Sequence, residues 1–251
     1  MSKRHHDDKN EAVALFNAAA RGGVLLLCEH ASHHIPQRYG DLGLRPEWRD
    51  SHAAWDPGAR PLAERLAVLL DSPMVAGGVS RLVYDLNRPP ESPSAMPAKS
   101  EVVEVPGNAS LTAGDRQERV DSIYAPFCDT VSAMLDQRPR AIVTVHSFTP
   151  VFNGAPRDTE IGILHDTDAR LADVMLEHAP ATRITRRNDP YGPQDGVTHS
   201  LQLHGIARGL PNVMIEVRND LLSTDHDIDT IAADLMAMLR PALNAVEVSD
   251  A

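Results

Sequence analysis

The sequence predicts an α/β fold, with one three-layer domain built on a mixed, mostly parallel central sheet. Short apolar runs that suit buried strands alternate along the chain with longer stretches of helical periodicity. The run AIVTV at residues 141–145 is apolar and rich in β-branched residues, as in a central strand covered on both faces. The chain has 251 residues and shows no internal repeat. We therefore expect a flexible segment at 1–20 and a single domain at 21–248.

Local patterns predict the individual elements. Short apolar runs predict strands at residues 24–28, 74–79, 82–86, 141–145, 161–164 and 212–217. Helical apolar spacing predicts helices at residues 57–70, 116–136, 168–177, 198–207 and 225–246. The first helix has Asp56 in the N-cap position and Pro57 in its first turn, and Pro241 can interrupt the last. The proline-rich tract at 88–108 predicts a long exposed loop of the kind that covers a site.

The composition excludes several classes of partner. The formal net charge is -11, and nucleic acids and anionic membranes repel a polyanion. The two cysteines, Cys28 and Cys128, predict reduced thiols and no disulfide framework. The sequence contains no apolar run of about 20 residues and no signal-peptide pattern. We expect a cytoplasmic protein that acts on small molecules, with no nucleic-acid or membrane partner; its oligomeric state is not predicted.

Ionisable and amide side chains follow four of the predicted strands. In open α/β sheets, ligand sites form at the carboxyl ends of the parallel strands. Here those ends carry the groups Glu29 and His30, Asp85 with Asn87 and Arg88, His146 and Ser147, and Glu216 with Arg218. The sequence therefore predicts one convergent site.

Two histidines and one carboxylate can hold a zinc ion and leave its fourth position for a water, whose pKa falls to roughly 7. We expect His30 and His146 to be the nitrogen ligands. Asp56 is the preferred carboxylate because Glu29, adjacent to His30, should point to the opposite face of its strand; Glu29 is the alternative. His33 is a weaker candidate. If no metal binds, the histidines are hydrogen-bonded structural residues and Asp56 caps a helix.

Other residues have patterns that suit hydrolysis and substrate binding. Glu216 is a candidate general base, and its structural alternative is an ion pair with Arg218. Ser147 adjoins His146 on a strand and faces away from it, so we expect Ser147 to contact substrate and not to act as a nucleophile. The motif SRLVYDLNR supplies donors that can bind a carboxylate: Arg81, Asn87 and Arg88.

Six motifs occur in the order CEHAS, HAAWDPGA, SRLVYDLNR, VHSFTP, NDPYG and IEVRNDL. Together they resemble the motifs of the N-formylglutamate amidohydrolase family, in its shorter branch. The resemblance extends from about residue 25 to residue 222. It implies a phosphorylase/hydrolase-like fold similar to the zinc carboxypeptidases and to the succinylglutamate and aspartate deacylases. It also implies one zinc ion, or another divalent metal, and hydrolysis of a small anionic N-acyl amino acid, N-formyl-L-glutamate being the named substrate.

The resemblance also implies roles for individual residues. His146 and Asp56 correspond to metal ligands, Glu216 to the base, and Arg81 to an arginine that polarises the substrate carbonyl. The Asn87–Arg88 pair corresponds to a pair that holds the substrate carboxylate. In RRNDPYG we expect further residues to help close the pocket around the substrate: Arg186, Arg187 and Asn188.

This chain departs from the family pattern at two points. Carboxypeptidases have a His-x-x-Glu pair at the first ligand, whereas here the residue three after His30 is His33. The better-characterised branch has Pro-His where this chain has Glu29–His30. Two alternatives therefore stay open: a deacylase or carboxypeptidase-like amidase on another N-acylated or cell-wall fragment, and a non-catalytic binding protein.

Overall fold

A computed structural model describes residues 11–249 and shows a seven-stranded sheet. In spatial order the strands are β1 (Val13–Phe16), β3 (Met74–Gly77), β2 (Val24–Cys28), β6 (Ala141–Phe148), β11 (Asn212–Arg218), β9 (Ile161–Leu164) and β10 (Thr185–Arg187). The four strands β3, β2, β6 and β11 are parallel. β1 is antiparallel to β3, β9 is antiparallel to β11, and β10 is parallel to β9. The predicted mixed, mostly parallel sheet is confirmed.

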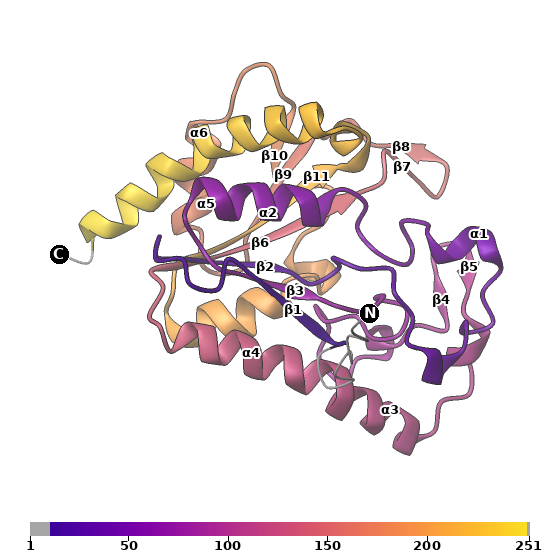
Figure 1. The fold of residues 1–251 in the computed structure, drawn as a ribbon. Coiled ribbons are helices and arrows are strands. Elements are labelled where there is room, and N and C mark those ends of the chain that lie inside the picture. The colour runs from indigo at the N-terminus through magenta and orange to yellow at the C-terminus, as the bar shows by residue number, and fades with distance from the viewer. Residues whose placement is uncertain (1–10, 250–251) are drawn as a thin grey trace, which may run out of the picture.

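Helices cover both faces of the sheet (Figure 1). One face packs against α2 (Ala59–Leu69), α5 (Arg170–Glu177) and α6 (Asp225–Ser249). The other packs against a continuous helical segment made of α3 (Ala113–Arg119), a π-helical turn (Val120–Tyr124) and α4 (Ala125–Leu135). All five residues of β2 are buried, and successive side chains enter opposite cores: Leu26 contacts the first layer, and Leu25 and Leu27 contact the second.

Shorter elements form the edges and the connections. The helical ones are the 3₁₀ turns Gln37–Tyr39, Pro93–Ala95, Pro106–Asn108, Pro193–Asp195, Ile206–Arg208 and Asn219–Leu222, the helix α1 (Pro46–Arg49), and a π-helix at Leu201–Gly205. Two small hairpins pair β4 (Lys99–Ser100) with β5 (Val103–Glu104) and β7 (Val151–Phe152) with β8 (Ala155–Pro156). The segment 88–108, which we expected to be a long loop, therefore contains two 3₁₀ turns and the β4–β5 hairpin. No helix among residues 11–249 is both long and apolar enough to cross a membrane.

The strand expected at 82–86 is wrong, because this segment forms turns. The Ser80 carbonyl accepts from the Val83 N–H at 2.9 Å, and the Ser80 hydroxyl accepts from the Leu82 N–H at 3.2 Å. These local bonds occupy N–H groups that a sheet ladder would need.

The first predicted helix is also wrong at its start. Helix α2 begins at Ala59, and its N-cap is Gly58 in the left-handed conformation at φ 80°. Asp56 therefore lies outside the helix, which frees its side chain for the site.

Three further differences concern the ends and interiors of elements. β1 lies within the segment 1–20 that we expected to be flexible; residues 1–10 lie outside the described part. α6 continues through Pro241. The segment predicted as helix 198–207 is helical, but largely as π and 3₁₀ turns.

Candidate active site

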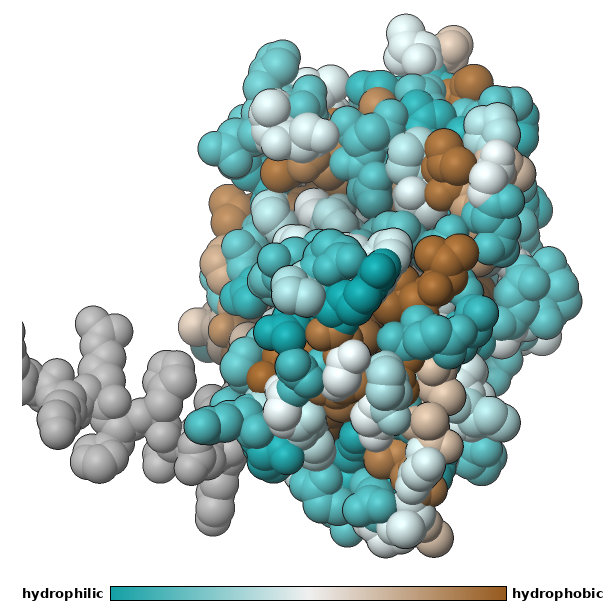
Figure 2. Space-filling model, turned by 90° about the vertical axis from the view of Figure 1, so that its right-hand side faces the viewer, coloured by the Kyte–Doolittle hydropathy of each residue, from teal (hydrophilic) through white to brown (hydrophobic). Residues whose placement is uncertain are grey.

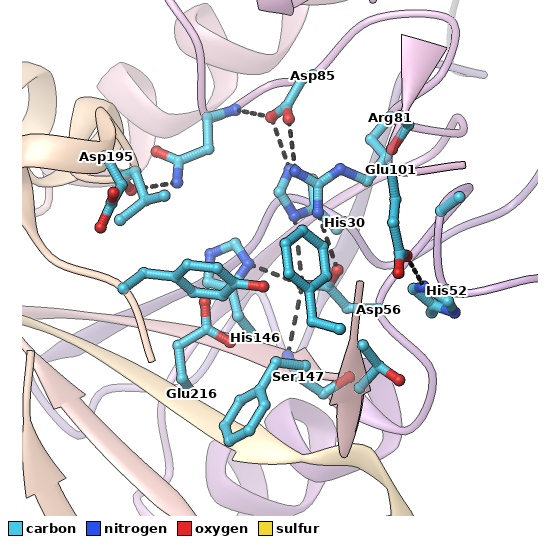
Figure 3. A pocket seen from close by; sticks show the side chains of 18 of the residues that line it. His30, His52, Asp56, Arg81, Asp85, Glu101, His146, Ser147, Asp195 and Glu216 are labelled. Carbon is cyan, nitrogen blue, oxygen red and sulfur yellow. Dashed lines mark hydrogen bonds and ion pairs between the residues drawn. The ribbon is translucent and has the colours of Figure 1, made fainter. Parts of the chain in front are cut away.

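The candidate site lies at the carboxyl ends of the parallel strands (Figure 3). His30 follows β2, while His146 lies in β6 and is paired in register with Glu216 of β11. Asp56 comes from the connection before α2, and its N–H donates to the His30 carbonyl oxygen at 3.0 Å. This backbone bond fixes the Asp56 side chain beside the two imidazoles.

The side chains of His30, Asp56 and His146 form a compact buried group that could hold a metal ion. Asp56 Oδ2 lies 3.2 Å from His30 Nδ1 and 2.9 Å from His146 Nδ1. Ligands of one tetrahedral zinc ion, each about 2.0–2.2 Å from the metal, lie roughly 3.3 Å apart. The three ligand atoms lie within 4.8 Å of one another, and no residue of the three is more than 3% exposed. Two nitrogens and one oxygen at these spacings fit a divalent ion.

A second carboxylate lies behind each imidazole. Asp85 Oδ1 is 2.7 Å from His30 Nε2, and Glu29 Oε2 is 3.1 Å from His146 Nε2. Such partners orient metal-binding histidines and leave the other ring nitrogen for the metal. Glu29 therefore contacts the far side of His146, and Asp56 occupies the position between the two histidines.

Charge coupling holds this group in its ionised form. Burial alone would lower the pKa of His146, but Glu29 and Asp56 raise it well above its usual value. Burial alone would raise the pKa of Asp56, but His30 and His146 hold it well below its usual value. Arg81 adds a fixed positive charge, donating to Asp56 Oδ1 at 3.3 Å and to Asp85 Oδ2 at 2.7 Å.

At Glu216, a buried carboxyl group, the nearby positive charges do not offset the effect of burial on the pKa. Burial raises its pKa to about 7; His146 opposes this shift and Asp56 adds to it. The alternative ion pair with Arg218 does not form, because Arg218 binds Asp220 at 2.8 Å. A carboxyl with a pKa near neutrality can both accept and donate a proton under physiological conditions.

A cavity of about 310 Å³ is lined by His30, Asp56, Asp85, His146 and Glu216 together with Arg81, Asn87, Arg88 and Ser147. The Ser147 hydroxyl donates to the Pro57 carbonyl at 2.7 Å. The Asn87 amide donates to the Val197 carbonyl and accepts from the Ser200 N–H at 2.9 Å. Arg88 donates to the Asp195 carbonyl at 3.0 Å, which fixes its guanidinium at the cavity edge.

The structure does not bring Arg187 and Asn188 to the cavity. Arg187 is paired with Asp173 at 2.7 Å, and Asn188 Oδ1 accepts from the His165 N–H at 2.9 Å. The reason is strand direction: β9 is antiparallel to β11, and β10 is parallel to β9. The carboxyl end of β10 therefore lies at the end of the sheet opposite to the carboxyl ends of β2, β6 and β11. Arg186 likewise pairs with Asp189 at 3.8 Å and does not line the cavity.

His33 lies outside the group of His30, Asp56 and His146: it is exposed and paired with Asp50 at 2.6 Å. Sequence reasoning gave no role to Tyr191, which lines the cavity and belongs to the motif NDPYG. It also gave none to His52 and Glu101, which line the cavity and form a 2.7 Å pair. The contact of Asp85 with His30 was also not predicted. The four-residue spacing between Arg81 and Asp85, which form an ion pair, was the sequence signal that Asp85 faces the site.

This fold and site define a class of α/β proteins that carry a buried His–Asp–His group, suited to a metal ion, at the carboxyl ends of their parallel strands. More particularly, the chain belongs to the N-formylglutamate amidohydrolase family, whose model matches residues 22–223. The family predicted from the six motifs is thereby confirmed.

Two solved structures show the same architecture. The gene product Atu2144 from Agrobacterium tumefaciens is 52% identical, with a TM-score of 0.92 over 95% of this chain and 97% of that one. The N-formylglutamate amidohydrolase from Ralstonia eutropha JMP134 is 17% identical, with a TM-score of 0.69 over 95% of this chain and 99% of that one, and this likeness concerns the fold alone. The search of curated proteins gave no match.

Proposed function

We propose that this protein is a zinc-dependent amidohydrolase that cleaves N-formyl-L-glutamate to formate and glutamate. The observation that carries the proposal is the meeting, in one cavity, of a buried His–Asp–His group with a separate carboxyl group of pKa about 7. Membership of the family supports the choice of N-formylglutamate as the substrate.

His30, Asp56 and His146 would hold the ion, which supplies Lewis-acid polarisation of the amide carbonyl and of water when it is bound. Glu216 accepts a proton from the attacking water and delivers it to the amide nitrogen as the C–N bond breaks. Arg81, anchored by two carboxylates at the cavity wall, stabilises the negative charge that develops on the carbonyl oxygen.

Substrate binding uses the opposite part of the cavity. Arg88 and Asn87 are held by backbone groups of residues 195–200, and their remaining donors suit a carboxylate. Ser147 lines the cavity close to Asp56, which receives its N–H at 3.4 Å. The two cysteines are free thiols, and we propose that the enzyme acts in the cytoplasm.

The test combines elemental analysis of the purified protein with a formate-release assay on N-formylglutamate. We expect about one equivalent of bound zinc and turnover in the wild type, and loss of both in His146→Ala. His226→Ala, which changes an exposed histidine on α6, is the matched control. Full activity in a folded His146→Ala protein would contradict the mechanism.

A further inference from the structure

Three aromatic rings form one wall of the cavity: Phe148, Phe152 and Tyr191. The guanidinium carbon of Arg157 lies 5.5, 4.5 and 4.8 Å from their respective ring centroids. Arg157 also donates to the Tyr191 hydroxyl at 2.9 Å. One cation therefore contacts two rings from the neighbouring strands β6 and β7 and a third from the distant segment after β10, which makes the wall a defined surface.

The hairpin that carries Phe152 is fixed across the cavity rim. The N–H of Asn153, next to Phe152, donates to Glu101 Oε1 at 3.1 Å. The other oxygen of Glu101 is 2.7 Å from His52 Nε2. The β7–β8 hairpin is thus attached to the segment between β4 and β5, so the aromatic wall exists before any ligand binds. A preformed wall loses little conformational freedom on binding.

Two apolar side chains are exposed on the hairpins β4–β5 and β7–β8. Val102 lies between β4 and β5 and is 61% exposed, and Val151 of β7 is 49% exposed. Figure 2 shows this side of the molecule, where hydrophobic residues are exposed among hydrophilic ones.

Arg157, the cation beside the three rings, donates to the Thr149 carbonyl and to the Tyr191 hydroxyl and is not among the residues that line the cavity. Among the described lining residues, the arginines are Arg81 and Arg88, and Arg81 is paired with Asp56 and Asp85. Arg88 is bonded to the carbonyl of Asp195. Asp195 and Glu101 lie on opposite sides of the metal-binding group (Figure 3).

Formyl carries no side chain that could cover an aromatic wall. We propose that Phe148, Phe152 and Tyr191 form a subsite for an apolar acyl group, branched aliphatic or aromatic, of an N-acyl amino acid. This inference rests on the proposed amidohydrolase function. The amino-acid carboxylate then faces Arg88, and the amide lies at the His–Asp–His group. Water adds to the acyl carbon, the C–N bond breaks, and Glu216 passes the proton from the water to the amide nitrogen, so the products are a free apolar carboxylic acid and the amino acid.

The test uses N-formyl-, N-acetyl-, N-isovaleryl- and N-benzoyl-L-glutamate. Dissociation constants are measured by calorimetry on the metal-loaded protein with Glu216→Gln, so that the ligands are not consumed, and kcat/KM is measured with Glu216 intact. We expect the benzoyl ligand to bind at least about tenfold more tightly than the formyl ligand, the usual scale for apolar groups in a fitted pocket.

Phe152→Ala should bring the benzoyl and formyl affinities close to equality, and Phe152→Leu should retain part of the difference. Phe16→Ala removes the same ring from β1, outside the cavity, and should retain all of it. The subsite proposal would be overturned by equal binding of the benzoyl and formyl ligands when Phe152 is intact. It would also be overturned by an unchanged preference for the benzoyl ligand in folded Phe152→Ala. Failure to hydrolyse any of the four compounds would refute the proposed function, and the binding data would still decide the subsite.

Discussion

Replacing Glu29 with glutamine tests whether the carboxylate behind His146 supports metal binding. Glu29 Oε2 lies 3.1 Å from His146 Nε2, and their side chains are 0% and 2% exposed, so solvent does not screen the contact. Glutamine keeps the size and an acceptor oxygen but removes the charge. Hydrogen bonds to charged groups contribute about 1.5–3 kcal/mol and neutral ones about 0.5–1.5 kcal/mol. The midpoints of these ranges differ by about 1.2 kcal/mol, or about eightfold in the metal dissociation constant.

The affinity for zinc is measured by competition with a chromophoric chelator at fixed pH, and circular dichroism reports the fold. Loss of an outer partner of a metal-binding histidine typically costs about 10- to 100-fold, and we expect the lower end because glutamine keeps an acceptor oxygen beside the imidazole. Glu64→Gln is the control, since Glu64 is paired with Arg60 on the surface of α2. Equal zinc affinities of the wild type and a folded Glu29→Gln protein would refute the reasoning.

Three other predictions address substrate, pH and packing. In steady-state kinetics, Arg88→Ala should raise KM for N-formylglutamate about 10- to 100-fold, whereas Arg187→Ala should leave it unchanged; equal effects would contradict the placement of the two arginines. The folded pKa of Glu216 is raised from 4.5 to about 7, so stability is lost as pH rises through this window. In denaturant unfolding of the metal-free proteins, the stability of Glu216→Gln relative to the wild type should increase as pH rises from 4.5 to about 7, by up to about 3 kcal/mol. A difference that does not change with pH would count against a raised pKa for Glu216. Gly77→Ala would place a Cβ 2.1 Å from a backbone carbonyl oxygen and should cost about 1–3 kcal/mol in thermal unfolding, whereas Gly114→Ala in α3, with its nearest atom at 3.7 Å, should gain up to about 1 kcal/mol; a neutral Gly77→Ala would show that the strands can separate locally.

The sequence predicted the fold class and the residues at the centre of the cavity because two strong signals agree. Buried strands such as β2 and β6 are short apolar runs, and their carboxyl ends carry the groups that converge. His30, His146 and Glu216 follow directly from this rule. Asp56 was preferred because Glu29, adjacent to His30, should point to the opposite face of its strand, and Asp56 indeed lies between the two histidines.

Strand direction and local turns were the parts that the sequence could not supply. A run such as 161–164 has the same pattern whether its neighbour is parallel or antiparallel, and the reversal at β9 moves Arg187 and Asn188 away from the cavity. The run 82–86 is apolar because it packs in a core, yet Ser80 directs it into turns. Asp85 consequently reaches His30 from a turn and not from a strand end.

The origin of the three metal-binding side chains has a consequence for how the protein can be assayed. Asp56 is 26 residues from His30 and 90 residues from His146, so no short peptide of the chain contains the complete group. An ion that binds only the assembled group stabilises the folded state, by an amount that grows with the logarithm of its free concentration. The unfolding temperature should therefore rise with added zinc, and the amount of tightly bound metal in a preparation should count its correctly folded molecules.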